Sequence, residues 1–183
     1  MPPAQFEELL AAIPRLSIRK WTIPQVQMLF KISYWCGLRI NEAIQLQVED
    51  FDLELKRIAL GQTKTEKQGK ATIPDLFIDE LTIYLMDKSG PLFEGMNYYI
   101  VYNWLARLGK MLNIKALTTP QSESGEKTKT HIFRKSVGKD MVYGTFGAKQ
   151  PLNLVQKKLR HSTLDMTSDY LKVSDEDVST AGW

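Results

Sequence analysis

Residues 26–39 read VQMLFKISYWCGLR, and this stretch predicts the centre of the fold. Its side chains are apolar on nearly every side, which is typical of a helix that is buried on most of its faces. Thr22 is a suitable cap before this helix, Pro24 suits its first turn, and Gly37 ends it. Arg39 therefore lies at a junction between two predicted helices, where a rigid backbone can hold a long side chain.

The chain has the size and composition of one globular domain. It has 183 residues, of which 43% are hydrophobic and 25% are charged. It contains no run of eighteen apolar residues and no charged-then-apolar leader, so we expect a soluble, intracellular protein. The single cysteine, Cys36, cannot form an internal disulfide. Its apolar neighbours Tyr34, Trp35 and Leu38 predict a thiol packed in the core.

Hydrophobic periodicity predicts a mainly α fold with one small antiparallel β-sheet. Between residues 51 and 74 apolar and polar residues alternate, which predicts short strands and a basic hairpin over 63–70. Residues 113–129 are rich in Thr, Ser, Lys and Gly and predict an exposed loop. Besides the central helix, helices are predicted over residues 6–13, 41–48, 75–87, 98–112, 130–143, 151–160 and 163–172.

Positive charge is concentrated in one part of the chain. Residues 127–161 contain nine Lys or Arg and one acid, Asp140, which gives this stretch a net charge of +8. Because the whole chain carries +3, the remainder carries −5. Such asymmetry favours contact with a polyanion, since basic side chains gain affinity by displacing the counterions of nucleic acid. A solvated basic face is the alternative interpretation of the charge alone.

Histidine occurs only twice, and both copies lie in this basic stretch. His131 and Arg134 are three residues apart, so on a helix they share a face. His161 precedes Tyr170 by nine residues, which on one continuous helix would place the two roughly half a circle apart. Residues 162–165 resemble a capping box that opens a new helix, so both side chains can face one point. Arginines, histidines and a tyrosine at these spacings suit attack on a phosphodiester.

Together these stretches resemble the catalytic domain of the tyrosine recombinases, also called phage-type integrases. The matching boxes are GLRINEA at 37–43, QTKT at 62–65 ahead of GKATIP at 69–74, THIFRKS at 130–136, and LVQKKLRHS at 154–162 leading to Asp169 and Tyr170. They follow one another in the family's order and cover nearly the whole chain. Each box is weak by itself, but all of them together, ending in the tyrosine, are highly specific. The resemblance implies the fold of that catalytic domain, an α+β fold.

The resemblance also implies a catalytic set. Its members are Arg39, Lys64, His131, Arg134, His161 and Tyr170. Arg39 and Arg134 would bracket the nonbridging oxygens of the phosphate. Tyr170 would attack the phosphorus, forming a 3′-phosphotyrosine and leaving a 5′-hydroxyl, with His131 as the candidate base. Lys64 would protonate the departing oxygen.

Two further roles are expected. His161 would donate a hydrogen bond to the phosphate, and Glu42 is expected to steady Arg39 instead of reacting. Lys67 and Lys70 share the hairpin with Lys64, so either could reach the scissile bond in its place.

The implied activity is site-specific DNA recombination or integration. No metal and no ATP are expected, since the covalent intermediate stores the cleaved linkage. The sequence contains no GxxxxGK[ST] loop and no acidic cluster resembling a metal site. Expected partners are double-stranded DNA with a specific target site, further copies of the chain in a tetramer on DNA, and an accessory DNA-binding protein. We expect a cytoplasmic or nucleoid-associated protein without a membrane partner.

DNA contacts are expected from basic residues in and around the boxes. These are Lys67, Lys70, Lys127, Lys129, Lys135 and Arg160. Arg160 stands where the family usually has glycine, so either the local turn differs or a phosphate contact has been gained. Met1 lies just before the first helix of the catalytic domain, so we expect residues 1–183 to form that domain alone, without the amino-terminal core-binding domain.

Two other functions fit parts of the pattern. A type IB topoisomerase shares the nucleophile and the phosphate clamp but acts as a monomer on any duplex. A degenerate DNA-binding module would occupy DNA without cutting it. Chain length and the His131 to Arg134 box favour the recombinase over the first, and the complete set of boxes favours it over the second.

Overall fold

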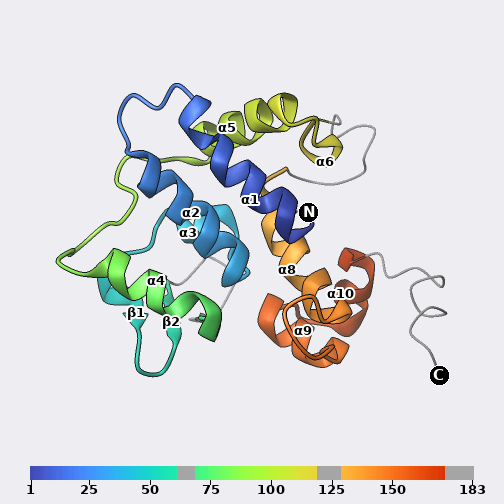
Figure 1. The fold of residues 1–183 in the computed structure, drawn as a ribbon. Coiled ribbons are helices and arrows are strands. Elements are labelled where there is room, and N and C mark those ends of the chain that lie inside the picture. The colour runs from blue at the N-terminus through green and yellow to red at the C-terminus, as the bar shows by residue number, and fades with distance from the viewer. Residues whose placement is uncertain (62–68, 119–128, 172–183) are drawn as a thin grey trace.

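Helices dominate the fold, and a small sheet follows the third of them (Figure 1). The computed structural model describes residues 1–61, 69–118 and 129–171. The α-helices are α1 (Pro3–Ala12), α2 (Ile23–Trp35), α3 (Ile40–Ala43), α4 (Asp75–Leu85), α5 (Tyr98–Met111), α6 (Lys115–Thr118), α8 (Ile132–Tyr143), α9 (Leu152–Leu159) and α10 (Leu164–Leu171). The 3-10 helices are η1 (Ile13–Arg15), η2 (Val48–Asp50) and η3 (Lys129–His131). The predicted fold class, mainly α with a small antiparallel sheet, is confirmed.

Within the described ranges, no helix is both long enough and apolar enough to cross a membrane.

The central helix α2 has the predicted start and end. Thr22 and Gln25 form a capping box. The Thr22 Oγ1 accepts from the Gln25 backbone N–H at 3.3 Å, and the Gln25 side-chain Oε1 accepts from the Thr22 backbone N–H at 3.0 Å. Most side chains of the helix are buried, and the Cys36 thiol that follows it is fully buried, as predicted. Burial raises the pKa of that thiol to about 12. Gly37 then adopts a left-handed φ of +66°, which lets the chain turn toward Arg39.

The sheet is antiparallel with the strand order β1 (Phe51–Asp52), β2 (Arg57–Leu60) and β3 (Gly69–Thr72) in the described part of the chain. Ile58 pairs with Ala71, and both side chains are buried on the core face, as the alternation predicts. The alternation that begins at Phe51 does not continue as a strand, because β1 ends at Asp52. The Leu55 amide donates to the Asp52 Oδ1 at 2.8 Å, and the turn into β2 begins there.

One helix prediction and one loop prediction were also wrong in extent. The helix predicted over 41–48 stops at Ala43, because the following backbone bonds to another segment: the Leu92 amide donates to the Leu46 carbonyl and the Val48 amide to the Gly90 carbonyl. The loop predicted over 113–129 contains α6. A Cβ on Gly109 of α5 would lie 2.4 Å from the Leu117 Cβ, so α6 packs closely on α5.

Helices α8, α9 and α10 group at one side of the molecule, opposite α4 with β1 and β2 (Figure 1). They share a small apolar cluster formed by Val137, Val155, Leu159 and Leu171. Gly138 of α8 faces it, and a Cβ there would lie 2.8 Å from the Leu171 Cδ2. The helix that contains the backbone of Tyr170 therefore packs directly on α8.

The break between α9 and α10 is confirmed, but its cap lies one residue later than predicted. Thr163, not Ser162, caps α10: its Oγ1 accepts from the Met166 amide at 3.2 Å. The Ser162 hydroxyl instead lies 2.9 Å from the Met166 sulfur. Residues 162 and 163 thus separate His161 from the helix that follows.

A buried hydrogen bond joins α2 to α8. The Tyr34 hydroxyl donates to the Asp140 Oδ2 at 2.6 Å, and both residues are buried. Burial, followed by the bond to Asp140, raises the pKa of this hydroxyl, so it stays protonated and donates. The Tyr34 ring stacks on Phe6 with centroids 4.1 Å apart.

We therefore predict that Tyr34→Phe destabilises the fold while preserving the stacked ring. The substitution removes only the hydroxyl. The buried Asp140 oxygen then lacks this donor, which costs about 1–3 kcal/mol of unfolding free energy. Urea unfolding monitored by circular dichroism measures the difference. Tyr99→Phe is the matched control, because Tyr99 is 76% exposed and the same change there is expected to cost less than about 0.5 kcal/mol. Equal stability of the two variants would contradict the prediction.

Candidate active site

The two arginines predicted to bind phosphate come together where α2 ends. Arg134 lies on α8 and is only 1% exposed. Its Nη1 donates to the Gly37 carbonyl at 2.7 Å, two residues before Arg39. One predicted arginine is therefore bonded to the turn that carries the other. Burial and this bond fix the Arg134 guanidinium before any ligand arrives.

Glu42 holds Arg39 in place, as expected. Its Oε1 accepts from the Arg39 Nη1 at 2.9 Å, and its Oε2 accepts from the Arg39 backbone amide at 2.7 Å. The same Oε2 accepts from the Nη2 of Arg160 at 2.7 Å. Burial raises the pKa of the Glu42 carboxyl, but the Arg160 charge and the hydrogen bonds from both arginines outweigh this effect and leave the pKa below its usual value. Glu42 is therefore ionised at neutral pH.

His161 lies at the centre of the positive charges. Its Nδ1 is 3.0 Å from the Thr167 Oγ1, and its backbone carbonyl accepts from the Gln156 Nε2 at 3.1 Å. The pKa of His161 is lowered to about 4, first by burial and then by the charges of Arg134, Arg39, His131 and Arg160, in that order. These groups must therefore lie close to one imidazole. The structure brings together Arg39, His131, Arg134 and His161 from three separate segments of the chain: the turn before α3, the start of α8 and the residues after α9.

His131 occupies the position that its spacing predicts, with a small difference in the helix type. It is the last residue of η3 and the N-cap of α8, with φ −82° and ψ −5°. Its backbone is thus nearly helical, and His131 and Arg134 belong to one turn of helix. The predicted shared face accounts for the action of both charges on His161.

Arg160, at the position where the tyrosine recombinases usually have glycine, keeps a glycine-like backbone. It is the C-cap of α9 with a left-handed φ of +52°. A left-handed conformation costs a non-glycine residue roughly 1–2 kcal/mol. The guanidinium bonds to Glu42, and the side chain is 16% exposed.

The remaining predicted residues are placed in part. Lys64, Lys67 and Lys127 lie outside the described residues. The backbones of Lys129 and Tyr170 lie in η3 and α10, but their side chains are also outside what the structure describes. Lys70 is exposed on β3, and Lys135 is half-buried on α8. The contacts of the predicted DNA-binding set thus remain predictions.

Sequence reasoning missed two residues that support the site. Thr167 lies on the last predicted helix, and its buried hydroxyl lies 3.0 Å from the His161 Nδ1 and orients that ring. Its position six residues after a histidine, across a helix break, is the only signal in the sequence. Lys158 belongs to the basic stretch over 127–161, and its Nζ donates to the carbonyl and the hydroxyl of Thr72 on β3. That contact joins β3 to α9.

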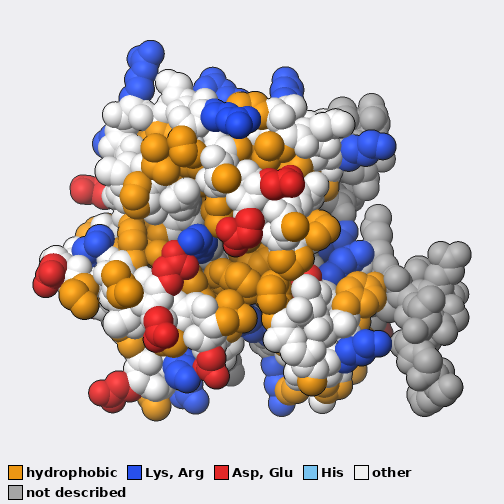
Figure 2. Space-filling model, in the orientation of Figure 1, with side chains coloured by type: hydrophobic (Ala, Val, Ile, Leu, Met, Phe, Trp, Pro, Cys, Tyr) orange, Lys and Arg blue, Asp and Glu red, His pale blue; other side chains and the backbone are white. Residues whose placement is uncertain are grey.

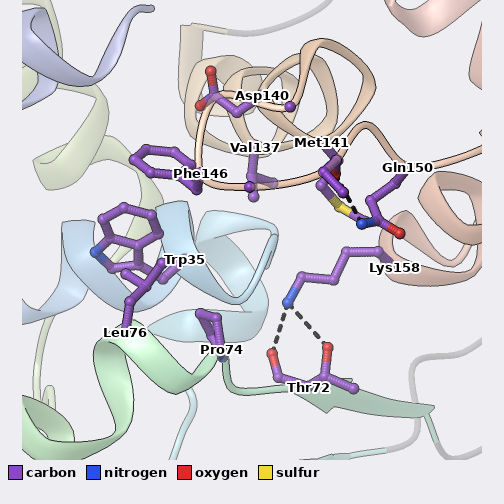
Figure 3. Close-up of a pocket in the computed structure, with 13 residues that line it drawn as sticks. Trp35, Thr72, Pro74, Leu76, Val137, Asp140, Met141, Phe146, Gln150 and Lys158 are labelled. Carbon is purple, nitrogen blue, oxygen red and sulfur yellow. Dashed lines mark hydrogen bonds between the residues drawn. The ribbon is translucent and has the colours of Figure 1, made fainter.

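An apolar pocket of about 360 Å³ is separate from the group formed by Arg39, His131, Arg134 and His161. Figure 2 shows hydrophobic side chains gathered in a hollow near the middle of this face. Trp35, Leu76 and Phe146 line one part, and Lys158 crosses toward Thr72 at another, so α2, α4, α8 and α9 all contribute (Figure 3). Arg39, His131, Arg134 and His161 are not among its lining residues. The chemistry of this group is therefore separate from this cavity.

The low pKa of His161 gives a pH prediction. Its usual value is near 6.5, so between pH 6.5 and about 4 the unfolded chain binds a proton that the folded chain does not. The contribution of His161 to stability is thus fully present above pH 6.5 and is lost as the pH falls toward 4. An NMR titration of the imidazole should give a midpoint near 4. His161→Asn should flatten the dependence of the unfolding free energy on pH in that window, and a midpoint near 6.5 would contradict the prediction.

Known proteins resemble the chain in sequence and in fold. The model of the phage integrase family matches residues 1–177. A tyrosine recombinase of Thermosipho africanus (strain TCF52B) is 28% identical over 153 residues, which cover 80% of this chain and 49% of the relative. The chain therefore spans about half the length of this relative.

Two solved structures share the fold. The catalytic domain of bacteriophage HP1 integrase superposes with a TM-score of 0.66 at 21% identity, covering 99% of this chain and 91% of that one. The XerH site-specific recombinase, in a post-cleavage complex with its palindromic difH substrate, superposes with a TM-score of 0.68 at 22% identity, covering 99% of this chain and 51% of that one. The predicted catalytic-domain fold is confirmed.

Proposed function

Since this chain belongs to the phage integrase family, we propose that it breaks and rejoins DNA at specific sites through a covalent intermediate on Tyr170. One observation carries the proposal: Arg134 is bonded to the turn that carries Arg39, both guanidinium charges act on His161, and a helix break separates His161 from the helix that contains Tyr170. A cluster of cations that converge on one point suits a single phosphodiester. The name of the related XerH structure, a recombinase on cleaved DNA, agrees with this activity.

Arg39 and Arg134 form the proposed phosphate clamp. A phosphodiester is so inert that an enzyme must lower its hydrolytic barrier by on the order of 20 kcal/mol. As the phosphorus becomes pentacoordinate, negative charge grows on the nonbridging oxygens, and two planar guanidinium groups donate to them in pairs. Arg134 is buried and already bonded to Gly37, so little reorganisation is needed during the reaction.

Tyr170 is the proposed nucleophile. Its phenolic oxygen forms a bond to phosphorus while the bond from phosphorus to the 5′ oxygen breaks. A phenol has a pKa near 10, so its proton passes to a base, for which His131 is the candidate. Lys64 gives a proton to the departing 5′ oxygen. In the reverse step a 5′-hydroxyl attacks the phosphotyrosine, so rejoining needs neither ATP nor a metal ion.

His161 is the proposed neutral donor to the phosphate. With a pKa of about 4 its imidazole is uncharged at neutral pH, and it has one N–H to donate. When the Thr167 hydroxyl donates to Nδ1, that proton resides on Nε2 and is available to a phosphate oxygen. Arrival of the phosphate charge offsets the surrounding cations, so bound DNA should raise this pKa.

Double-stranded DNA with a specific site is the proposed partner. The chain is expected to assemble as a tetramer on paired sites, with an accessory DNA-binding protein as a further partner. Because Lys and Arg side chains displace counterions when they bind phosphates, affinity should fall steeply as salt concentration rises.

Cleavage mapping on the DNA that flanks the gene tests the proposed function. The protein should cleave each strand at one defined position, leave a 5′-hydroxyl on one side of the break, and remain covalently attached to the 3′ end on the other. Relaxation of a supercoiled plasmid that lacks any such site would instead favour the topoisomerase. Specific binding with no strand breakage, even at high protein concentration, would favour the non-catalytic module.

A further inference from the structure

Arg160 occupies a backbone position that a glycine would occupy without strain. It follows α9 with φ +52° and directly precedes His161. Its side chain is 16% exposed and turns toward α3 instead of extending into solvent. Its Nε is buried and has no hydrogen-bond partner among the residues that the structure describes. A strained backbone and a buried guanidinium indicate that this arginine has a specific contact to make.

That contact is Glu42. The Oε2 of Glu42 accepts from the Arg160 Nη2 at 2.7 Å, while its Oε1 accepts from the Arg39 Nη1 at 2.9 Å. Side-chain exposure is 10% for Glu42 and 16% for Arg160, so water screens this pair only weakly. One carboxylate thus joins two guanidinium groups, one beside α3 and the other beside His161. Glu42 and Arg160 are 118 residues apart along the chain, so the bond joins two distant stretches of sequence.

The charge balance gives this bridge a consequence. Arg39 paired with Glu42 alone is neutral, whereas the trio that includes Arg160 has a net charge of +1. A phosphodiester has a charge of −1. With Arg160 present, Glu42 is held by a cation on each side, and Arg39 keeps its attraction for the phosphate.

We propose that Arg160 is a positioning residue, whose bond to Glu42 sets Arg39 and the adjacent His161 at the correct separation for one phosphate. This inference rests on the proposed function, because it assigns Arg160 a role in the cleavage of DNA. It differs from a direct phosphate contact, in which Arg160 would add to DNA affinity. The Gly69 backbone of β3 also lies beside Arg160, so the bridge is enclosed by a third element: a Cβ on Gly69 would be 3.8 Å from the Arg160 Nη1.

Arg160→Gly is the informative substitution, because glycine accepts the left-handed backbone. At saturating DNA we expect the rate of covalent adduct formation to fall about 10- to 100-fold, since displaced catalytic groups lose rate without losing substrate. The dissociation constant should change less than about threefold, and the salt dependence of binding should keep its slope. Arg160→Lys should restore part of the rate, because it restores the charge but not the planar fork.

Lys56→Gly is a matched control. Lys56 also has a left-handed backbone, with φ +50°, and its Nζ is also paired with a carboxylate, the Asp75 Oδ1 at 2.8 Å. The control removes the same charge and the same type of contact outside the candidate site, and its cleavage rate should match wild type. An Arg160→Gly rate equal to that of this control would overturn the inference. So would an unchanged rate at saturating DNA with a salt slope reduced by about one, which is the signature of a lost phosphate contact.

A double-mutant cycle tests the route through Glu42. In a Glu42→Gln background Arg160 has lost its ion-pair partner, so adding Arg160→Gly should reduce the rate by much less than it does in wild type. Fully additive effects of the two substitutions would show that Arg160 acts independently of Glu42 and would overturn the inference.

NMR separates failure of this inference from failure of the proposed function. In Arg160→Gly the Glu42 carboxyl should titrate at higher pH, and the Arg39 Nε and His161 imidazole signals should shift, whereas Lys56→Gly should leave all three unchanged. If these signals do not respond to Arg160→Gly, the positioning role is wrong whatever the enzyme does. If they respond but wild type cleaves no duplex, the proposed function fails and the bridge between the two boxes stands.

Discussion

Tyr170→Phe is expected to abolish the covalent adduct with DNA. On a nicked duplex, wild type should trap itself on the 3′ end when the short 5′ fragment diffuses away, and denaturing gels should show a protein–DNA band. Phenylalanine keeps the ring but has no oxygen to bond to phosphorus. The rate of adduct formation should therefore fall by on the order of 10⁴-fold or more, the scale of loss of an essential nucleophile. DNA binding should be nearly unchanged.

Tyr143→Phe is the control for this experiment. Tyr143 ends α8, is 41% exposed, and is the one tyrosine in the basic stretch over 127–161. This variant should form the adduct at the wild-type rate. An adduct that survives Tyr170→Phe but disappears in Tyr143→Phe would mean that the nucleophile is misassigned.

The second large effect is expected at the phosphate clamp. Arg134→Ala and Arg39→Ala should each lower the cleavage rate about 10²- to 10³-fold, because each removes a charged donor to the oxygens that gain charge in the transition state. Affinity for DNA should fall only modestly, since many other cations contact the backbone. Arg134→Lys should not restore the rate, because a lysine cannot donate in the bidentate geometry of a guanidinium. Single-turnover assays at saturating DNA measure these rates.

Burial of Arg134 makes a folding control necessary. The Arg134→Ala variant also loses the bond to Gly37, so its thermal unfolding must be compared with that of Arg134→Lys and wild type. Arg15→Ala, in an exposed position of η1, removes the same side chain away from the site and should cleave normally. Folded Arg134 and Arg39 variants that cleave at the wild-type rate would contradict the clamp.

The sequence predicted those parts of the fold that depend on local signals. Thr22, Pro24 and Gly37 delimit α2 as expected, because caps and breakers act within one turn of helix. The extent of the helix after Arg39 was mispredicted because residues 46–48 bond to residues 90–92, a contact between distant segments. The first strand was mispredicted because the Asp52 carboxylate stabilises a turn within an alternating pattern.

The candidate site follows the same division. Spacing alone placed His131 beside Arg134 and required a break between His161 and Tyr170, both of which the structure contains. The bond from Arg134 to Gly37 and the bridge from Arg160 to Glu42 join residues about one hundred positions apart. No local pattern contains such contacts. Besides burial, the depressed pKa of His161 depends on charges from distant segments, those of Arg39 and of the start of α8, so it also required the folded arrangement.

A structure of the protein covalently bound to a nicked duplex would test the central claim most directly. We predict one scissile phosphate joined to the Tyr170 oxygen, with Arg39, Arg134 and His161 each about 3 Å from its nonbridging oxygens. A phosphate held by other residues, with these three groups facing away from it, would contradict the account.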